Sequence, residues 1–299
     1  MNVRRIGYRY QRTLLRSTEV VGIGFLTGAP IRLRFNPAPP SSGVVFVRTD
    51  LQQPLSVAAQ VGMVSGTQRR TTLGRPPVQV ALVEHVLAAL AGMRVDNCFV
   101  ELNGPEPPGL DGSAQQFVDA IRRTGVRMQP ARRAIYGVNH SVLVTQGGAT
   151  LALHPSQDDE LRITYALDYG PRSPINRQTH SETITPETFI NFISSCRTFL
   201  LESEAHELRR QGLGSRTSAA DLLIFGPRGV IGNRLRFADE PSRHKILDLV
   251  GDLSLFGHDL RGHVVAYRSG HPLNVELVRK LGRVESNGRQ YQNQLTRAA

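Results

Sequence analysis

Residues 241–256 carry the pattern that most restricts how this chain can fold. His244, Asp248 and Asp252 are spaced by four residues, so a helix places all three on one face. Apolar side chains flank this stripe, at Ile246, Leu247, Leu249, Val250 and Leu253. The segment is therefore expected to form a long amphipathic helix that packs against the rest of the molecule. Its polar stripe is either a solvated, salt-bridged face or part of a functional site.

The remaining apolar segments predict two halves of similar design. In the first half we expect strands at 20–28, 31–35, 44–48 and 98–102, and helices at 83–93 and 114–124. In the second half we expect strands at 141–145, 149–153, 161–167, 221–225 and 264–268, and helices at 186–194, 205–211 and 241–256. Strands plus at least two helices recur in each half, which indicates an α+β protein.

A polar, basic segment at 125–134, which contains Pro130, separates the two halves. We expect the domain boundary there, with an N-terminal α+β domain at 9–127 and a C-terminal one at 132–285. The basic N-terminal residues 1–16 lack the hydrophobic core of a secretory signal, and we expect them to be a partly disordered lead-in to the first strand.

Composition favours an ordinary globular protein that binds an anionic small molecule. The 299 residues carry a net charge of +11, which suits nucleic acid, a membrane surface or a phosphorylated ligand. The arginines are scattered and form no nucleic-acid-binding motif, so nucleic acid is not expected. A transient membrane-surface contact stays open, and no protein partner is predicted. No apolar run reaches the ~18–20 residues of a membrane span, and Cys98 and Cys196 read as isolated buried thiols, so we expect a cytoplasmic protein.

Two further polar features accompany the stripe. Glu84-His85 opens a strongly apolar helix, and His271 follows a glycine in a turn after a strand. Each has an ordinary explanation alone: a helix N-terminus favours Glu84, and a loop often carries a surface histidine. Together with the stripe they meet the needs of a catalytic zinc, which takes three protein ligands and keeps a fourth position open.

We therefore expect His85, His244 and Asp248 to be ligands of one zinc ion per chain, although iron(II) would accept the same set. Glu84 lies next to a ligand and would serve as the general base. His271 would serve as the general acid, and Asp252 would orient and charge-stabilise it.

At this point the sequence resembles the UDP-3-O-acyl-N-acetylglucosamine deacetylases, the zinc amidases of lipid A biosynthesis. The resemblance covers roughly residues 12–281. The matching segments, in chain order, are Val83-Glu84-His85, Leu90-Ala91-Gly92, Asp96-Asn97, Gly104-Pro105-Glu106, Leu110-Asp111-Gly112-Ser113-Ala114, Arg197-Thr198-Phe199, Gly212-Leu213, Leu235-Arg236-Phe237, Asp239-Glu240, Arg243-His244-Lys245, Gly251-Asp252-Leu253, Ser269-Gly270-His271 and Leu273-Asn274.

The resemblance implies hydrolysis of the N-acetyl group of an acylated UDP-sugar, with Thr198 helping to hold the oxyanion. It implies that Lys245 and Phe199 contact the sugar or its phosphates, and that Tyr169 meets the uracil ring. It also implies two α+β domains with their helices sandwiched between two sheets, and a hydrophobic acyl passage near 200–214 in the second domain.

Some positions depart from the family pattern. Leu26 replaces a histidine in the Gly22–Gly28 turn, Gly214-Ser215-Arg216 replaces a glycine-rich stretch, and the 149–153 strand lacks a lysine offered to the diphosphate. The candidate metal ligands are intact. Two alternatives therefore remain: a deacetylase of a different acetylated sugar, and a non-catalytic homologue that binds a nucleotide sugar or lipid.

Overall fold

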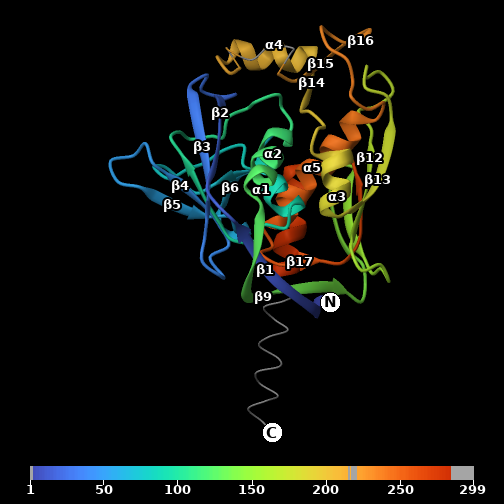
Figure 1. Cartoon of the computed structure of the whole chain (residues 1–299). Helices are drawn as coiled ribbons and strands as arrows, with labels where there is room; N and C mark the ends of the chain where they lie inside the picture. The colour runs from blue at the N-terminus through green and yellow to red at the C-terminus, as the bar shows by residue number, and fades with distance from the viewer. Residues whose placement is uncertain (1–2, 215, 217–220, 284–299) are drawn as a thin grey trace.

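The computed structural model describes residues 3–214, 216 and 221–283. Two five-stranded sheets face each other with helices between them, so the predicted α+β sandwich is confirmed (Figure 1). The first sheet has the order β2 (Thr18–Ile23), β3 (Pro30–Pro37), β8 (Cys98–Leu102), β4 (Val44–Arg48), β5 (Leu55–Ala58). The second has the order β10 (Val142–Gln146), β11 (Ala149–His154), β18 (Gly262–Tyr267), β12 (Leu161–Leu167), β13 (Gln178–Ile184).

The two sheets share one topology. In each, the third strand along the sheet is the last to enter in sequence, and it pairs antiparallel with one neighbour and parallel with the other, as β8 does with β3 and β4 and β18 does with β11 and β12. All other pairs within these sheets are antiparallel. The recurrence expected from the sequence is thus a repeated strand arrangement.

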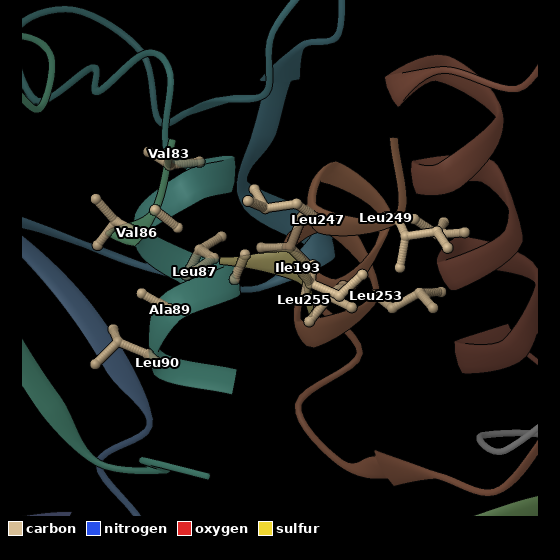
Figure 2. Close-up of a cluster of buried hydrophobic side chains, with 14 of the residues drawn as sticks. Val83, Val86, Leu87, Ala89, Leu90, Ile193, Leu247, Leu249, Leu253 and Leu255 are labelled. Atoms are coloured by element: carbon tan, nitrogen blue, oxygen red, sulfur yellow. The ribbon is translucent and has the colours of Figure 1, made fainter. Parts of the chain in front are cut away.

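The helices between the sheets form the core. They are α1 (Glu84–Gly92), α2 (Gln115–Thr124), α5 (Glu240–Ser254), the short α3 (Pro186–Thr188) continued by the π-helical turn η2 (Phe189–Ile193), and a helix over 271–283. Figure 2 shows Val86, Leu87 and Leu90 of α1 among the buried side chains that also include Leu247 and Leu253 of α5. Helix α1 is apolar on nearly all sides because other elements surround it.

Helices α1 and α5 approach each other unusually closely at Gly251. A Cβ atom built on Gly251 would lie 2.1 Å from the backbone oxygen of Glu84. Because no side chain fits there, glycine permits the backbone contact. This contact brings the first turn of α1, which carries Glu84 and His85, against the middle of α5.

One expectation for the connecting segments is wrong. Residues 1–16 are not a disordered lead-in over the described part, because Val3–Leu14 forms the strand β1. Most of the polar segment at 125–134 belongs to the strand β9 (Val126–Val138), which pairs antiparallel with β1 and parallel with β17 (Asp259–Leu260). Pairing between the two strands satisfies the backbone groups of both segments.

Two arginines of this three-stranded sheet form ion pairs with aspartates that are distant in sequence. Arg9 contacts Asp96 at 2.7 Å and Asp259 at 2.5 Å, and Arg133 contacts Asp259 at 2.6 Å. Asp96 lies beside α1 and Asp259 lies in β17, so this cluster ties the two halves together at the end shown lowest in Figure 1.

A small unit caps the opposite end of the sandwich (Figure 1). It consists of β14 (Phe199–Leu201), α4 (Glu202–Arg210), β15 (Leu223–Gly226) and β16 (Gly229–Val230). Ala205, Leu222 and Ile224 form its own apolar cluster, with Leu200 and Phe25 packed against it. On the first half, η1 (Val61–Met63), β6 (Val64–Gly66) and β7 (Thr72–Leu73) complete the fold.

Most predicted elements differ from the structure only at their ends, except that β2 stops at Ile23 before the Gly24–Gly28 turn. Cys98 and Cys196 are buried free thiols, as expected. Among the described residues, no helix is both long and apolar enough to cross a membrane.

Candidate metal centre

The candidate residues from both halves line one pocket of about 590 Å³. Those that line it are Glu84, His85, Tyr169, Thr198, Phe199, His244, Lys245, Asp248 and His271. Asp252 lies behind His271 and contacts it directly. The structure therefore brings together every site residue that the sequence singled out.

His85, His244 and Asp248 form a compact set of metal donors. One atom from each lies within 4.8 Å of the others. Oδ1 of Asp248 is 3.4 Å from Nε2 of His85 and 3.5 Å from Nε2 of His244, and the two imidazole rings meet edge to face. Two imidazoles and one carboxylate in this arrangement suit a divalent transition metal.

Neighbouring groups fix the protonation state of His244. Nδ1–H of His244 donates to the backbone oxygen of Cys196 at 3.0 Å. The other ring nitrogen, Nε2, therefore carries the lone pair and faces Asp248. Burial lowers the pKa of His244 to about 4, against the opposing effect of Asp248, so the ring is neutral near pH 7.

Lys245 supplies the charge that keeps Asp248 ionised. Its Nζ donates to Oδ2 of Asp248 at 2.6 Å, which leaves Oδ1 to face the histidines. Burial alone would raise the pKa of Asp248, but Lys245 and then His244 outweigh it and hold that pKa well below its ordinary value. A proton therefore does not compete for this carboxylate at neutral pH.

Thr198 completes the donor side of the pocket. Its Oγ1 lies 3.1 Å from Nε2 of His244 and 3.5 Å from Nε2 of His85. The segment around it is held by Arg197, whose buried guanidinium pairs with the fully buried Glu240 at 2.9 Å. This pair anchors the loop that carries Thr198 and the Cys196 carbonyl to the start of α5.

Glu84 lies in the first turn of α1 beside the donors and is nearly inaccessible to solvent. Its Oε2 accepts a hydrogen bond from the backbone N–H of Thr71 at 3.0 Å, and its Oε1 is 4.0 Å from Nε2 of His271. Burial raises the pKa of Glu84, with His271 and His85 acting in the opposite direction. A carboxylate with a raised pKa is a stronger base.

His271 is not a loop histidine, because it is the first residue of the helix over 271–283. Its Nδ1 lies 2.8 Å from Oδ2 of Asp252. Burial would lower the pKa of His271, but the Asp252 carboxylate outweighs burial and raises that pKa to about 9. The imidazole is therefore protonated near pH 7 and can donate a proton.

An aromatic wall adjoins the donors. The ring of Phe199 lies 6.1 Å from that of His244 and 5.9 Å from that of Tyr169, measured between centroids. Tyr169 is 46% exposed, so its ring faces the pocket entrance. Of the leucines expected near an acyl passage, Leu200 lines the pocket, whereas Leu201, Leu208 and Leu213 are half-buried and are not among its described lining residues.

Two further residues at the site contact partners that are distant in sequence, and no local sequence pattern indicates these contacts. Thr71 contacts Glu84, Asp252 and His271, yet its local sequence contains no pattern that indicates this. Glu106, which the motif comparison named without a role, accepts hydrogen bonds from the backbone N–H groups of Leu26 and Thr27. That contact holds the turn in which Leu26 departs from the family pattern.

Comparison with known proteins identifies this arrangement. The family model for UDP-3-O-acyl N-acetylglycosamine deacetylase matches residues 11–283. The chain is 41% identical to the UDP-3-O-acyl-N-acetylglucosamine deacetylase of Myxococcus xanthus, over 91% of this chain and 86% of the relative. It is 40% identical to the deacetylase of the same name from Nostoc sp., over 91% of this chain and 98% of the relative, and 39% identical to that of Geobacter sp., over 91% and 88%.

A two-sheet α+β fold with these relatives defines an enzyme of the hydrolase class. Within that class, the chain belongs to the UDP-3-O-acyl N-acetylglycosamine deacetylase family.

Proposed function

We propose that this chain is a cytoplasmic, zinc-dependent deacetylase that converts UDP-3-O-acyl-N-acetylglucosamine to the free amine and acetate, at the committed step of lipid A biosynthesis. One observation carries the proposal: three metal donors, a buried carboxylate and a histidine paired with Asp252 meet in a single pocket. The names of the relatives support the substrate.

His85, His244 and Asp248 would hold the ion, because their donor atoms converge and the environment keeps His244 and Asp248 unprotonated. Iron(II) also accepts this donor set. When bound, such an ion polarises a substrate carbonyl and makes water more acidic.

The reaction breaks the amide C–N bond and forms a C–O bond to water. Glu84 would accept the proton of that water at Oε1, because Oε2 is held by the N–H of Thr71. Nε2 of His271 would give a proton to the departing nitrogen, since Nδ1 is held by Asp252. The Thr198 hydroxyl, at the donor cluster, would donate to the developing oxyanion.

The rest of the pocket would bind the substrate. Lys245 and Phe199 would contact the sugar or its phosphates, and Tyr169 would stack on the uracil ring at the entrance. Leu200 would mark the start of an acyl passage, beneath the apolar cluster of the capping unit.

Acetate release tests the proposal. Purified zinc-loaded enzyme is assayed with UDP-3-O-acyl-N-acetylglucosamine, UDP-N-acetylglucosamine and a plain acetylated sugar, with and without a chelator. We expect turnover of the acylated UDP-sugar that the chelator abolishes. Preference for another acetylated sugar would indicate a related deacetylase, and binding without turnover would indicate a non-catalytic homologue. Full activity in metal-free protein would rule out the zinc mechanism.

A further inference from the structure

Thr71 is in contact with both proposed proton-transfer groups. It is fully buried between β6 and β7, next to Thr72. Its backbone N–H donates to Oε2 of Glu84 at 3.0 Å, and its carbonyl accepts from the N–H of Val83 at 3.3 Å. The main chain of Thr71 is therefore bound on both sides to the start of α1.

The Thr71 side chain reaches the opposite half of the molecule. Its hydroxyl donates to Oδ1 of Asp252 at 2.6 Å. The other oxygen of Asp252 accepts from His271 and from the amide of Asn274, each at 2.8 Å. An ionised carboxylate can only accept, so Nδ1 of His271 carries a proton and its Nε2 faces Glu84.

The same hydroxyl also meets His271. Oγ1 of Thr71 is 3.2 Å from Nδ1 of His271. Because the hydroxyl proton is committed to Asp252, its lone pair is available to the Nδ1–H group. This proton is thus shared between Asp252 and Thr71, and the ring plane of His271 is fixed by two acceptors.

We propose that Thr71 is a positioning residue that holds Glu84 and the Asp252–His271 pair in one frame, an inference that rests on the proposed deacetylase function. The backbone of Thr71 orients the base, and its hydroxyl orients the acid. Base and acid reach the pocket from different halves of the chain, and their facing atoms lie 4.0 Å apart. Thr71 is the residue through which that separation is maintained.

Substitutions at Thr71 distinguish the contribution of its hydroxyl from that of its backbone N–H. Thr71→Val keeps the shape and the N–H but removes the hydroxyl, whereas Thr71→Ser keeps both polar groups. We expect Thr71→Val to lower kcat ~10–100-fold, the scale of a misplaced catalytic group, with KM and zinc content close to wild type. Thr71→Ser should recover most of the loss. Should Thr71→Val fail to fold, Thr71→Ala removes the same hydroxyl without a branched side chain.

Thr72→Val is the matched control. Thr72 is also buried and is adjacent in sequence, but its side chain lies toward Gly66 of β6 rather than toward the pocket. We expect near wild-type kinetics from this variant. A loss equal to that of Thr71→Val would mean that any change to this strand impairs the enzyme, and would overturn the proposal.

A double-mutant cycle tests whether the hydroxyl acts through Asp252. In an Asp252→Asn background the orienting carboxylate is already lost, so adding Thr71→Val should lower kcat by less than ~3-fold, as for residues that act as a unit. Independent, multiplicative losses would contradict the proposal.

A measurement without substrate separates this inference from the proposed function. In zinc-free protein, the Nδ1 proton of His271 should give a slowly exchanging NMR signal in wild type, Thr71→Ser and Thr72→Val. Thr71→Val should accelerate its exchange at least ~10-fold, because one of its two acceptors is gone. Unchanged exchange would overturn the positioning role, even if the enzyme is an active deacetylase. If Thr71→Val accelerates the exchange but the wild-type protein releases no acetate, the contact between Thr71 and His271 is supported and only the proposed function is refuted.

Discussion

Nδ1 of His271 lies 2.8 Å from Oδ2 of Asp252, and the two residues come from different helices. The carboxylate raises the pKa of His271 to about 9 despite complete burial of the imidazole. Burial favours the neutral ring, so without this charge the pKa of His271 would fall. The pair therefore decides whether His271 holds a proton near pH 7.

Asp252→Asn should move the basic limb of the kcat/KM profile to lower pH. In wild type the acid form of His271 is lost only as pH rises through about 9. The amide keeps the shape but removes the charge, so the proton is lost at lower pH while zinc content stays unchanged. His271→Ala should eliminate this limb and lower turnover ~100-fold or more. An empty metal site in Asp252→Asn, with the basic limb in place, would instead assign Asp252 to support of the zinc ligands.

The proposed ligands and the proposed base should differ in their effect on metal content. His85→Ala, His244→Ala and Asp248→Ala each remove a donor and should weaken zinc retention on dialysis. Glu84→Gln should retain about one zinc per chain and lose turnover, because the amide cannot accept the proton. Metal analysis by mass spectrometry, together with acetate release, distinguishes the two classes.

His154→Ala is a suitable control for the ligand variants. His154 lies in β11 and contacts Ser141 at 2.7 Å, away from the donor cluster. Its replacement should leave zinc content and turnover unchanged. Loss of zinc from this variant would show that metal content responds to general destabilisation rather than to removal of a ligand.

Gly251→Ala should separate α1 from α5 and misplace Glu84. The new methyl group would meet the backbone oxygen of Glu84 at 2.1 Å, and a backbone atom cannot rotate away. We expect a loss of about 1–3 kcal/mol in unfolding free energy, the usual cost of overpacking, and a fall in kcat. Chemical denaturation and steady-state kinetics measure both.

Gly282→Ala is the matched substitution, because Gly282 is also helical and a Cβ atom there meets nothing within 4 Å. This change should leave kcat unaltered and raise stability slightly, since alanine favours a helix by roughly 0.5–1 kcal/mol over glycine. Equal destabilisation by the two variants would argue against the close contact at Gly251 as the cause.

Bulk added at Leu200 should discriminate between substrates by acyl length. Leu200→Phe narrows the pocket below the capping unit, so KM should rise more for a long-chain substrate than for a short-chain one. Leu208→Phe is the comparison, because Leu208 is half-buried on α4 and is not among the described residues that line the pocket. Equal effects of Leu200→Phe on both substrates would indicate that Leu200 is only a core residue.

The sequence predicted the parts of this site that depend on local periodicity. The four-residue spacing of His244, Asp248 and Asp252 fixes a common helix face wherever α5 lies. The resemblance then supplied Thr198 and the pocket wall, and the structure places these residues together. The recurrence of strands and helices in each half was visible in the sequence, but the shared strand order of the two sheets was not.

What could not be predicted depends on contacts between distant segments. Thr71 is 181 residues from Asp252 in sequence, and nothing around it indicates a polar contact across the molecule. Residues 3–14 contain too many arginines to look like a paired strand, yet Arg9 is neutralised by Asp96 and Asp259. His271 looked like a turn residue because a helix beginning at Gly270-His271-Pro272 carries no usual N-cap side chain.

Strand β9 is the segment through which the chain passes from one sheet to the other, and it has a consequence for how substrate enters. It is hydrogen-bonded to β1 along most of its length and to β17 near its end. If the two halves moved apart at this end, the hydrogen bonds between β9 and β17 and the ion pair between Arg9 and Asp259 would have to break. The two halves are therefore held together at this end of the sandwich by strand pairing and ion pairs. We therefore expect a substrate to enter at the opposite end, where the exposed Tyr169 and Leu200 of the capping unit line the pocket.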